Sequence, residues 1–252
     1  MLFCRQSPGA RETVGILLLV VFGVFVAAPT VQAQPKLSLV EERGVFVILA
    51  DGRVLLRVRF RGSYASCEER AKAILKRLQE VFAASWKSPP TFRIVREKSG
   101  AFSAFCGGKR LFSVFREDAR ANSSNLLDLA ILWLNEVQMA FYGVSEGTCE
   151  VEKVFTGLAS FYHSKFDRRK TSSGETYSSY AFTAAHRTLP LGSVLLVTNP
   201  RNGKRVVVKV NDRGPWRKNR VVDLSLVAAK ALGIEETGVD NVRIEVIRWK
   251  KR

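Results

Sequence analysis

The sequence has few residues of several kinds, and each shortage excludes a class of site. Its 252 residues include two histidines and four cysteines, and no Cys-x-x-Cys pair or histidine cluster suggests a metal site. Zinc-finger spacings, RNA-binding signatures and recognition-helix patterns are also missing from the sequence. We therefore expect no metal, no cofactor and no nucleic-acid partner.

Acidic residues are scarce relative to basic ones. Asp and Glu number 23 against 40 Lys and Arg, which gives a formal net charge of +17 at pH 7. This charge indicates attraction to an anionic wall polymer or membrane surface, with a solvated basic surface as the alternative. A hydrophobic content of 46% is enough for two modest cores, so we expect two domains.

The N-terminus has the pattern of an export signal. Arg5 and Arg11 precede the apolar run Val14–Ala28, which is shorter than the roughly 20 apolar residues of a membrane-spanning helix. Small residues in Val31-Gln32-Ala33 suit cleavage after this tripeptide, and an uncleaved anchor is the alternative. Because Cys4 precedes the run, lipid attachment is not expected. We predict an exported protein, periplasmic or associated with the cell wall, that is not a lipoprotein.

The composition predicts four segments. Residues 1–33 form the signal peptide, 34–142 a small α+β accessory module, 143–153 a Gly- and Ser-containing linker, and 154–252 a second domain. Export permits disulfides, but an odd number of remaining cysteines leaves their connectivity open, and buried reduced cysteines are the alternative. These cysteines are Cys67, Cys106 and Cys149.

Two hairpins and two helices are expected in residues 34–142. Asp51-Gly52 suits a tight turn, and Ser66 with Glu69 forms a capping box ahead of the first helix. The second helix, about Asn125–Phe141, has Asn122, Ser123 and Ser124 as potential caps. It carries an apolar stripe with Trp133, which indicates core rather than a ligand site. The expected strands are Val45–Ala50, Val54–Phe60, Thr91–Val95, Ala101–Phe105 and Arg110–Phe115.

The second domain consists mainly of short strand-like runs between glycine turns. One short helix, about Leu226–Leu232, is expected between Ser225 and Gly233, with Asp223 and Ser225 as its caps. Many strands with one small helix favour a barrel. The expected strands are Gly157–Tyr162, Ser193–Thr198, Arg205–Val210 and Val242–Ile247.

This domain also carries eight ordered motifs. They are Gly157-Leu-Ala-Ser-Phe-Tyr162, Ser173-Gly-Glu-Thr-Tyr177, Thr183-Ala-Ala-His186, Thr188-Leu-Pro190, Val197-Thr-Asn199, Asn202-Gly203, Val210-Asn-Asp-Arg-Gly-Pro215 and Val222-Asp-Leu-Ser225. In this order they resemble the RlpA-like proteins. The resemblance implies an all-β, six-stranded double-psi β-barrel, lytic transglycosylase activity on peptidoglycan, and kinship with expansins. The family often has Trp-Tyr-Gly where this chain has Phe161-Tyr162-His163.

Three titratable residues in these motifs are the candidate catalytic groups. Transglycosylation needs one carboxyl group to protonate the glycosidic oxygen and then to deprotonate the attacking C6 hydroxyl. The resemblance assigns this role to Asp212, with Glu175 as a like charge that raises the pKa of Asp212. His186 would orient a carboxylate or bind a sugar hydroxyl. The alternatives are a turn aspartate, a solvated loop glutamate and a structural histidine.

A second group of residues is expected to bind the substrate. Tyr162 and Trp216 would stack on sugar faces, with core packing as the alternative for each ring. Arg213 follows Asp212 in sequence, and neighbours on a strand normally face opposite sides. The predicted substrate-binding residues are Tyr162, Thr183, Asn211, Arg213 and Trp216.

Two functions follow from these motifs. The first is an exported endolytic peptidoglycan lytic transglycosylase that cleaves MurNAc–GlcNAc bonds in glycan strands and leaves 1,6-anhydroMurNAc ends. The alternative is a non-catalytic, expansin-like protein that binds glycan or loosens the wall. Two carboxylates favour the enzyme, because a binding module needs aromatic platforms more than paired carboxylates. Stem-peptide preference, septal targeting and the role of the first module stay open.

Overall fold

The computed structural model describes residues 34–145, 147–217 and 219–249. The expected signal peptide and Cys4 lie outside these ranges. Within them, no helix has both the length and the apolar character needed to cross a membrane. The described residues belong to one compact unit, and the division into an accessory module and a second domain stays a prediction.

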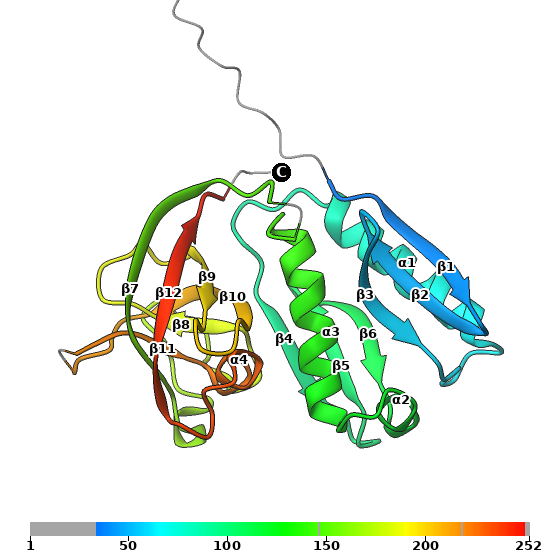
Figure 1. Cartoon of the computed structure of the whole chain (residues 1–252). Coiled ribbons are helices and arrows are strands. Elements are labelled where there is room, and N and C mark those ends of the chain that lie inside the picture. The colour runs from blue at the N-terminus through cyan, green and yellow to red at the C-terminus, as the bar shows by residue number, and fades with distance from the viewer. Residues whose placement is uncertain (1–33, 146, 218, 250–252) are drawn as a thin grey trace, which may run out of the picture. The chain divides into compact units, whose positions relative to one another are not determined.

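The first module contains two three-stranded antiparallel sheets and three helices (Figure 1). The predicted hairpin turn is confirmed, because Asp51 and Gly52 both have positive φ angles, 46° and 81°. Its elements are β1 (Leu37–Glu42), β2 (Val45–Ala50), β3 (Arg53–Val58), α1 (Cys67–Ala83), β4 (Phe92–Arg96), β5 (Phe102–Cys106), β6 (Lys109–Val114), α2 (Arg116–Ala121) and α3 (Leu126–Phe141). The sequence analysis missed β1 and α2, which are both short.

Side-chain caps fix the starts of both long helices. The Ser66 side chain accepts a hydrogen bond from the Glu69 main-chain nitrogen at 3.1 Å, as predicted. The Glu69 carboxylate reaches back one residue further than expected and accepts from the Ala65 nitrogen at 3.3 Å. Asn125 caps α3 by accepting from the Asp128 nitrogen at 2.8 Å. Trp133 on α3 is 3% exposed, which confirms that its stripe is core.

The second half of the chain forms a closed six-stranded barrel in the order β10-β8-β11-β7-β12-β9. Two neighbouring pairs, β10 with β8 and β11 with β7, are parallel, and the other pairs are antiparallel. This confirms the predicted six-stranded barrel. The elements are β7 (Val151–Phe161), a 3-10 turn η1 (Ser164–Phe166), β8 (Thr183–Ala185), β9 (Val194–Thr198), β10 (Arg205–Asp212), β11 (Arg220–Leu224), α4 (Leu226–Leu232) and β12 (Val239–Ile247).

Local details of the barrel differ from the sequence expectations. Strand β7 begins at Val151, inside the segment expected to be a linker. Ser225 precedes α4, but its side chain does not cap the helix, and its oxygen instead lies 3.5 Å from the Thr183 nitrogen. Asp223 does not cap it either, because its carboxylate accepts from the Ser160 hydroxyl at 2.5 Å. Gly233 closes α4 with a φ of 72°, as predicted.

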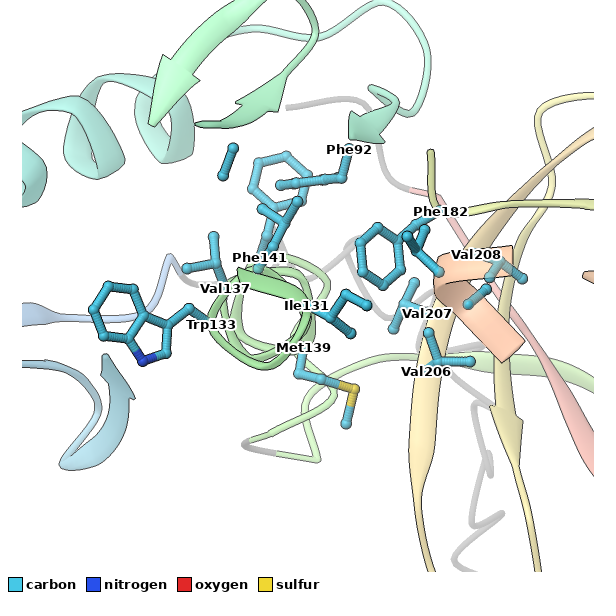
Figure 2. Packing of buried hydrophobic residues seen from close by; sticks show 14 of the residues in the cluster. Phe92, Ile131, Trp133, Val137, Met139, Phe141, Phe182, Val206, Val207 and Val208 are labelled. Carbon is cyan, nitrogen blue, oxygen red and sulfur yellow. The ribbon is translucent and has the colours of Figure 1, made fainter. Parts of the chain in front are cut away.

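The first module and the barrel share hydrogen bonds and a hydrophobic core. The Phe182 nitrogen donates to the Phe92 oxygen at 2.9 Å, so β4 pairs with the segment that leads into β8. In Figure 2 the side chains of Ile131, Phe182 and Val207 lie together, and all three belong to one buried cluster. Helix α3 contacts β10 and α4 on one side and the sheet of β4 to β6 on another (Figure 1). The barrel therefore packs directly against the first module.

Candidate active site at the end of strand β10

Asp212 is the last residue of β10, and its carboxylate is held by four hydrogen bonds. One oxygen accepts from the Ser172 nitrogen at 2.9 Å, from the Ser172 hydroxyl at 2.7 Å and from the Arg213 nitrogen at 2.8 Å. The other oxygen accepts from the Tyr162 hydroxyl at 3.2 Å. A register shift against β8 lies just before Asp212. These contacts fix the orientation of a half-buried carboxylate at a strand end.

Tyr162 follows β7 directly and carries the hydroxyl that meets Asp212. Its ring lies 5.5 Å from the Phe166 ring and 5.2 Å from the Tyr177 ring, between centroids. Burial, followed by the negative charges of Asp212 and Asp223, raises the pKa of Tyr162. Tyr162 therefore keeps its proton at neutral pH and donates a hydrogen bond. Its position beside Asp212 is compatible with its predicted role in substrate binding.

Glu175 lies in the loop before β8 and is paired with a lysine from β10. Its carboxylate accepts from Lys209 Nζ at 2.6 Å and from the Asn211 side-chain amide at 3.0 Å. Burial acts to raise the pKa of Glu175, but these two hydrogen bonds and the Lys209 charge outweigh it, so the pKa lies below its usual value. The expected like-charge effect on Asp212 is therefore opposed by the Lys209 ammonium, which the sequence analysis did not pair with Glu175.

The His186 ring is held by the turn that follows it. Nδ1 accepts from the Thr188 nitrogen at 3.2 Å and from the Leu189 nitrogen at 3.0 Å, so the proton of the neutral ring is on Nε2. Burial, followed by the charges of Lys153, Arg213 and Arg187, lowers the pKa of His186. The His186 main-chain nitrogen donates to the Asp212 main-chain oxygen at 3.2 Å. His186 is thus anchored beside Asp212 through the backbone.

Two arginines donate hydrogen bonds to main-chain carbonyls in the loops around this strand end. Arg213 Nη1 donates to the His186 oxygen at 3.2 Å and to the Leu189 oxygen at 2.7 Å. Arg187 donates from Nε to the Pro215 oxygen at 2.6 Å, and from Nη2 to the carbonyls of Arg217 and Arg220. Arg213, predicted to bind substrate, therefore donates these side-chain hydrogen bonds to main-chain carbonyls.

The other predicted substrate-binding residues differ widely in exposure. Trp216 is 79% exposed, so its indole is available to stack on a ligand. Asn211 is 4% exposed and positions Glu175, and Thr183 is 2% exposed within β8. The structure therefore brings Tyr162 to Asp212 and leaves Thr183 inside the barrel.

Ser172, Lys209 and Arg187 are site residues that the sequence analysis missed. Lys209 could have been found, because it interrupts a run of four valines in β10. Ser172 and Arg187 have no such pattern in the sequence. As for metals, the described ranges contain no group of three or more His, Cys, Asp or Glu side chains that could hold an ion.

Two family models match the chain. Residues 154–244 match a family described as "Lytic transglycolase", and residues 46–142 match a domain of unknown function, DUF8459. The chain is 54% identical over 96 residues to "Endolytic peptidoglycan transglycosylase RlpA" of Pasteurella multocida and 56% identical over 91 residues to the protein of that name in Pseudomonas aeruginosa. These alignments cover 38% and 36% of this chain.

The alignments also cover only 33% and 27% of the two relatives, so the chain spans about a third of their length. Among solved structures, an expansin of Clavibacter michiganensis is 21% identical, with a TM-score of 0.33, over 40% of this chain and 53% of that one. The closed barrel and its family match define the C-terminal part as a lytic transglycosylase domain of the double-psi β-barrel class. Over residues 154–244, the chain matches this lytic transglycosylase family model and is similar to the RlpA proteins.

Proposed function

We propose that the chain is an exported endolytic peptidoglycan lytic transglycosylase, which cleaves MurNAc–GlcNAc bonds and leaves 1,6-anhydroMurNAc ends. The names of the RlpA relatives and their identity over the barrel support this activity. The observation that carries the proposal is the Asp212 carboxylate, which four hydrogen bonds orient at the end of β10. Acid-base catalysis requires such a positioned carboxyl group.

Asp212 performs both proton transfers in this proposal. It first protonates the glycosidic oxygen, and it then removes the proton of the C6 hydroxyl that attacks C1. Tyr162 and Ser172 keep the carboxyl group oriented through their hydroxyls. Glu175, held by Lys209, positions the loop that carries Ser172, and Trp216 offers a stacking surface for a sugar ring.

Asp212→Asn tests the assignment because it keeps the size of the side chain and removes its titration. We expect release of anhydro products from peptidoglycan to fall at least 100-fold, about the contribution of general acid-base catalysis, while glycan binding is kept. Mass spectrometry of the soluble products measures this. Asp51→Asn makes the same chemical change in a remote hairpin that tolerates Asn-Gly, and it should leave product release unchanged.

The outcome also separates the enzyme from a glycan-binding protein. Anhydro product at the wild-type rate from Asp212→Asn would overturn the catalytic assignment. If the wild type binds glycan but releases no soluble product, the alternative function, a non-catalytic expansin-like protein, is supported. The exposed Trp216 favours this alternative. Reducing ends in place of anhydro ends would mean that water is the nucleophile.

The proposal includes an export route and a location. Arg5, Arg11, the apolar run Val14–Ala28 and the Val31-Gln32-Ala33 site support a cleaved signal peptide and a periplasmic or wall-associated protein without lipid. The net charge of +17 supports additional contact with an anionic wall polymer or membrane surface. N-terminal sequencing of exported protein should read from Gln34, and a membrane-bound chain that retains Met1 would contradict the signal peptide.

A further inference from the structure

A pocket of about 430 Å³ lies beside the candidate active site and includes residues with no role in the proposed reaction. His186 connects the two, because it lines the pocket while its main-chain nitrogen donates to the Asp212 main-chain oxygen. The remaining lining comes from β7, β11 and the turn after His186. It consists of Lys153, Phe155, Thr156, Arg187, Thr188 and Val221.

One part of the pocket is apolar because of a glycine in β7. A Cβ on Gly157 would stand 2.4 Å from a methyl carbon of Val221, so only glycine lets Val221 lie this close to the strand. Val221 and the half-buried Phe155 ring therefore line the pocket together. The Phe155 ring also packs against His186, with 5.6 Å between ring centroids. This surface suits a small apolar group such as a methyl.

The other part of the pocket is cationic and rich in donors. Lys153 Nζ lies 5.7 Å from the centroid of the Phe155 ring, and no carboxylate of the described residues forms an ion pair with it. His186 offers Nε2–H, because its Nδ1 already accepts two hydrogen bonds. The Arg187 guanidinium adds a fixed positive charge, and the charges of Lys153 and Arg187 contribute to the lowered pKa of His186. An anion is therefore favoured here.

We propose that this pocket is a subsite for a carboxylate on a methyl-bearing carbon, with Lys153 and His186 Nε2 binding the carboxylate and Phe155 and Val221 contacting the methyl. The inference rests on the proposed function, because peptidoglycan carries this group in two places. One is the lactyl ether of MurNAc in glycan without stem peptides. The other is the terminal alanine of a stem peptide, which is present only while the stem is attached.

Binding to three tetrasaccharide probes tests the subsite without requiring catalysis. The probes are stem-free GlcNAc–MurNAc tetrasaccharide, the same glycan with alanine-terminated stems, and chitotetraose, which has neither carboxylate. Calorimetry is done on the full chain carrying Asp212→Asn, so that no probe is cleaved. We expect Lys153→Gln to weaken binding of a carboxylate probe about fivefold, as the loss of one partly exposed ion pair implies, and to leave chitotetraose unchanged.

The outcomes of the binding experiment distinguish the two possible carboxylates from each other and from the absence of a subsite. A loss confined to the stem-free probe identifies the lactyl carboxylate, and a loss confined to the stem-bearing probe identifies the stem terminus. Lys153→Arg should restore binding, and Lys98→Gln, which removes one exposed lysine from the first module, should change nothing. Equal weakening of chitotetraose, or no weakening of any probe, overturns the subsite and leaves the transglycosylase proposal standing. If the chain without Lys153→Gln binds none of the probes, both fail.

Discussion

The first module and the barrel each contain a cation–carboxylate pair, and the two pairs are built differently. In the first module, Arg70 and Asp118 form two parallel hydrogen bonds of 2.8 and 2.7 Å, and their side chains are 2% and 0% exposed. In the barrel, Lys209 and Glu175 meet at 2.6 Å, with side chains 12% and 40% exposed. The first pair is closed to solvent, whereas the second leaves its carboxylate accessible.

The surroundings of the two pairs explain the difference. Arg70 also donates to the Phe60 and Ser113 main-chain oxygens, and Asp118 accepts from the Phe115 nitrogen at 3.0 Å. These contacts compensate the cost of burying the charges, so the pair serves the fold alone. The barrel pair instead lies on the strand that ends at Asp212. A charged group that remains partly exposed, as Glu175 does, is accessible to a ligand, whereas the buried Arg70–Asp118 pair is not.

The largest expected loss of stability comes from breaking the buried Arg70–Asp118 pair. Asp118→Ala leaves the Arg70 guanidinium buried and without its carboxylate, so we expect a loss of about 3–5 kcal/mol in the free energy of unfolding, measured with urea. Glu68→Ala is the control, because it removes the exposed Lys72–Glu68 pair of α1 and should cost at most about 0.5 kcal/mol. Equal losses in the free energy of unfolding from Asp118→Ala and Glu68→Ala would show that burial does not increase the cost of breaking an ion pair.

A double variant separates lost packing from unpaired charge. Arg70→Met with Asp118→Leu removes both charges and keeps apolar volume in the same place. We expect this variant to recover most of the stability that Asp118→Ala loses, because replacing a whole buried pair is often neutral. If the double variant is as unstable as Asp118→Ala, the hydrogen bonds to main-chain carbonyls matter more than the ion pair.

Sequence reasoning found the parts of the fold that are fixed locally. The Asp51-Gly52 turn and the Ser66 cap act within four residues, so their patterns are visible along the chain. The cap of α3 was predicted wrongly, because Asn125 caps this helix and not Asn122, Ser123 or Ser124. Strands β8 and β11 were missed because they are three and five residues long and depend on parallel partners far away in sequence. No local pattern distinguishes such short strands from loops.

The same limit applies to the candidate site. Asp212 and Tyr162 could be singled out through the resemblance, but their contact joins residues 50 positions apart. The partner of Glu175 is 34 positions away, and a sequence gives no distance between such groups. Its pairing with Lys209 changes the expected electrostatics of the site, because an ionised Glu175 whose charge is balanced by the Lys209 ammonium perturbs Asp212 less than an unpaired carboxylate would.

A smaller effect is expected from breaking the partly exposed Lys209–Glu175 pair, and its size depends on pH. The folded-state pKa of Glu175 lies below the usual value of about 4.3, so the pair stabilises the fold above that pH, and the contribution is lost as pH falls through the lowered pKa. Lys209→Met should therefore cost about 1 kcal/mol at neutral pH, a value limited by solvent screening, and less at an acid pH below the lowered pKa of Glu175. Urea unfolding at both pH values measures this.

A matched pair in the same domain provides the control for Lys209→Met. Lys230 and Glu235 meet at 2.5 Å with side chains 24% and 39% exposed, but neither lies on β10. Lys230→Met should cost similar or smaller stability and leave the pH dependence of product release unchanged. Lys209→Met should instead leave Glu175 with a charge that Asp212 can sense, and so move the alkaline limb of the activity profile, where the general acid loses its proton, to higher pH. An unchanged profile would show that Glu175 does not tune Asp212 and acts through the position of its loop.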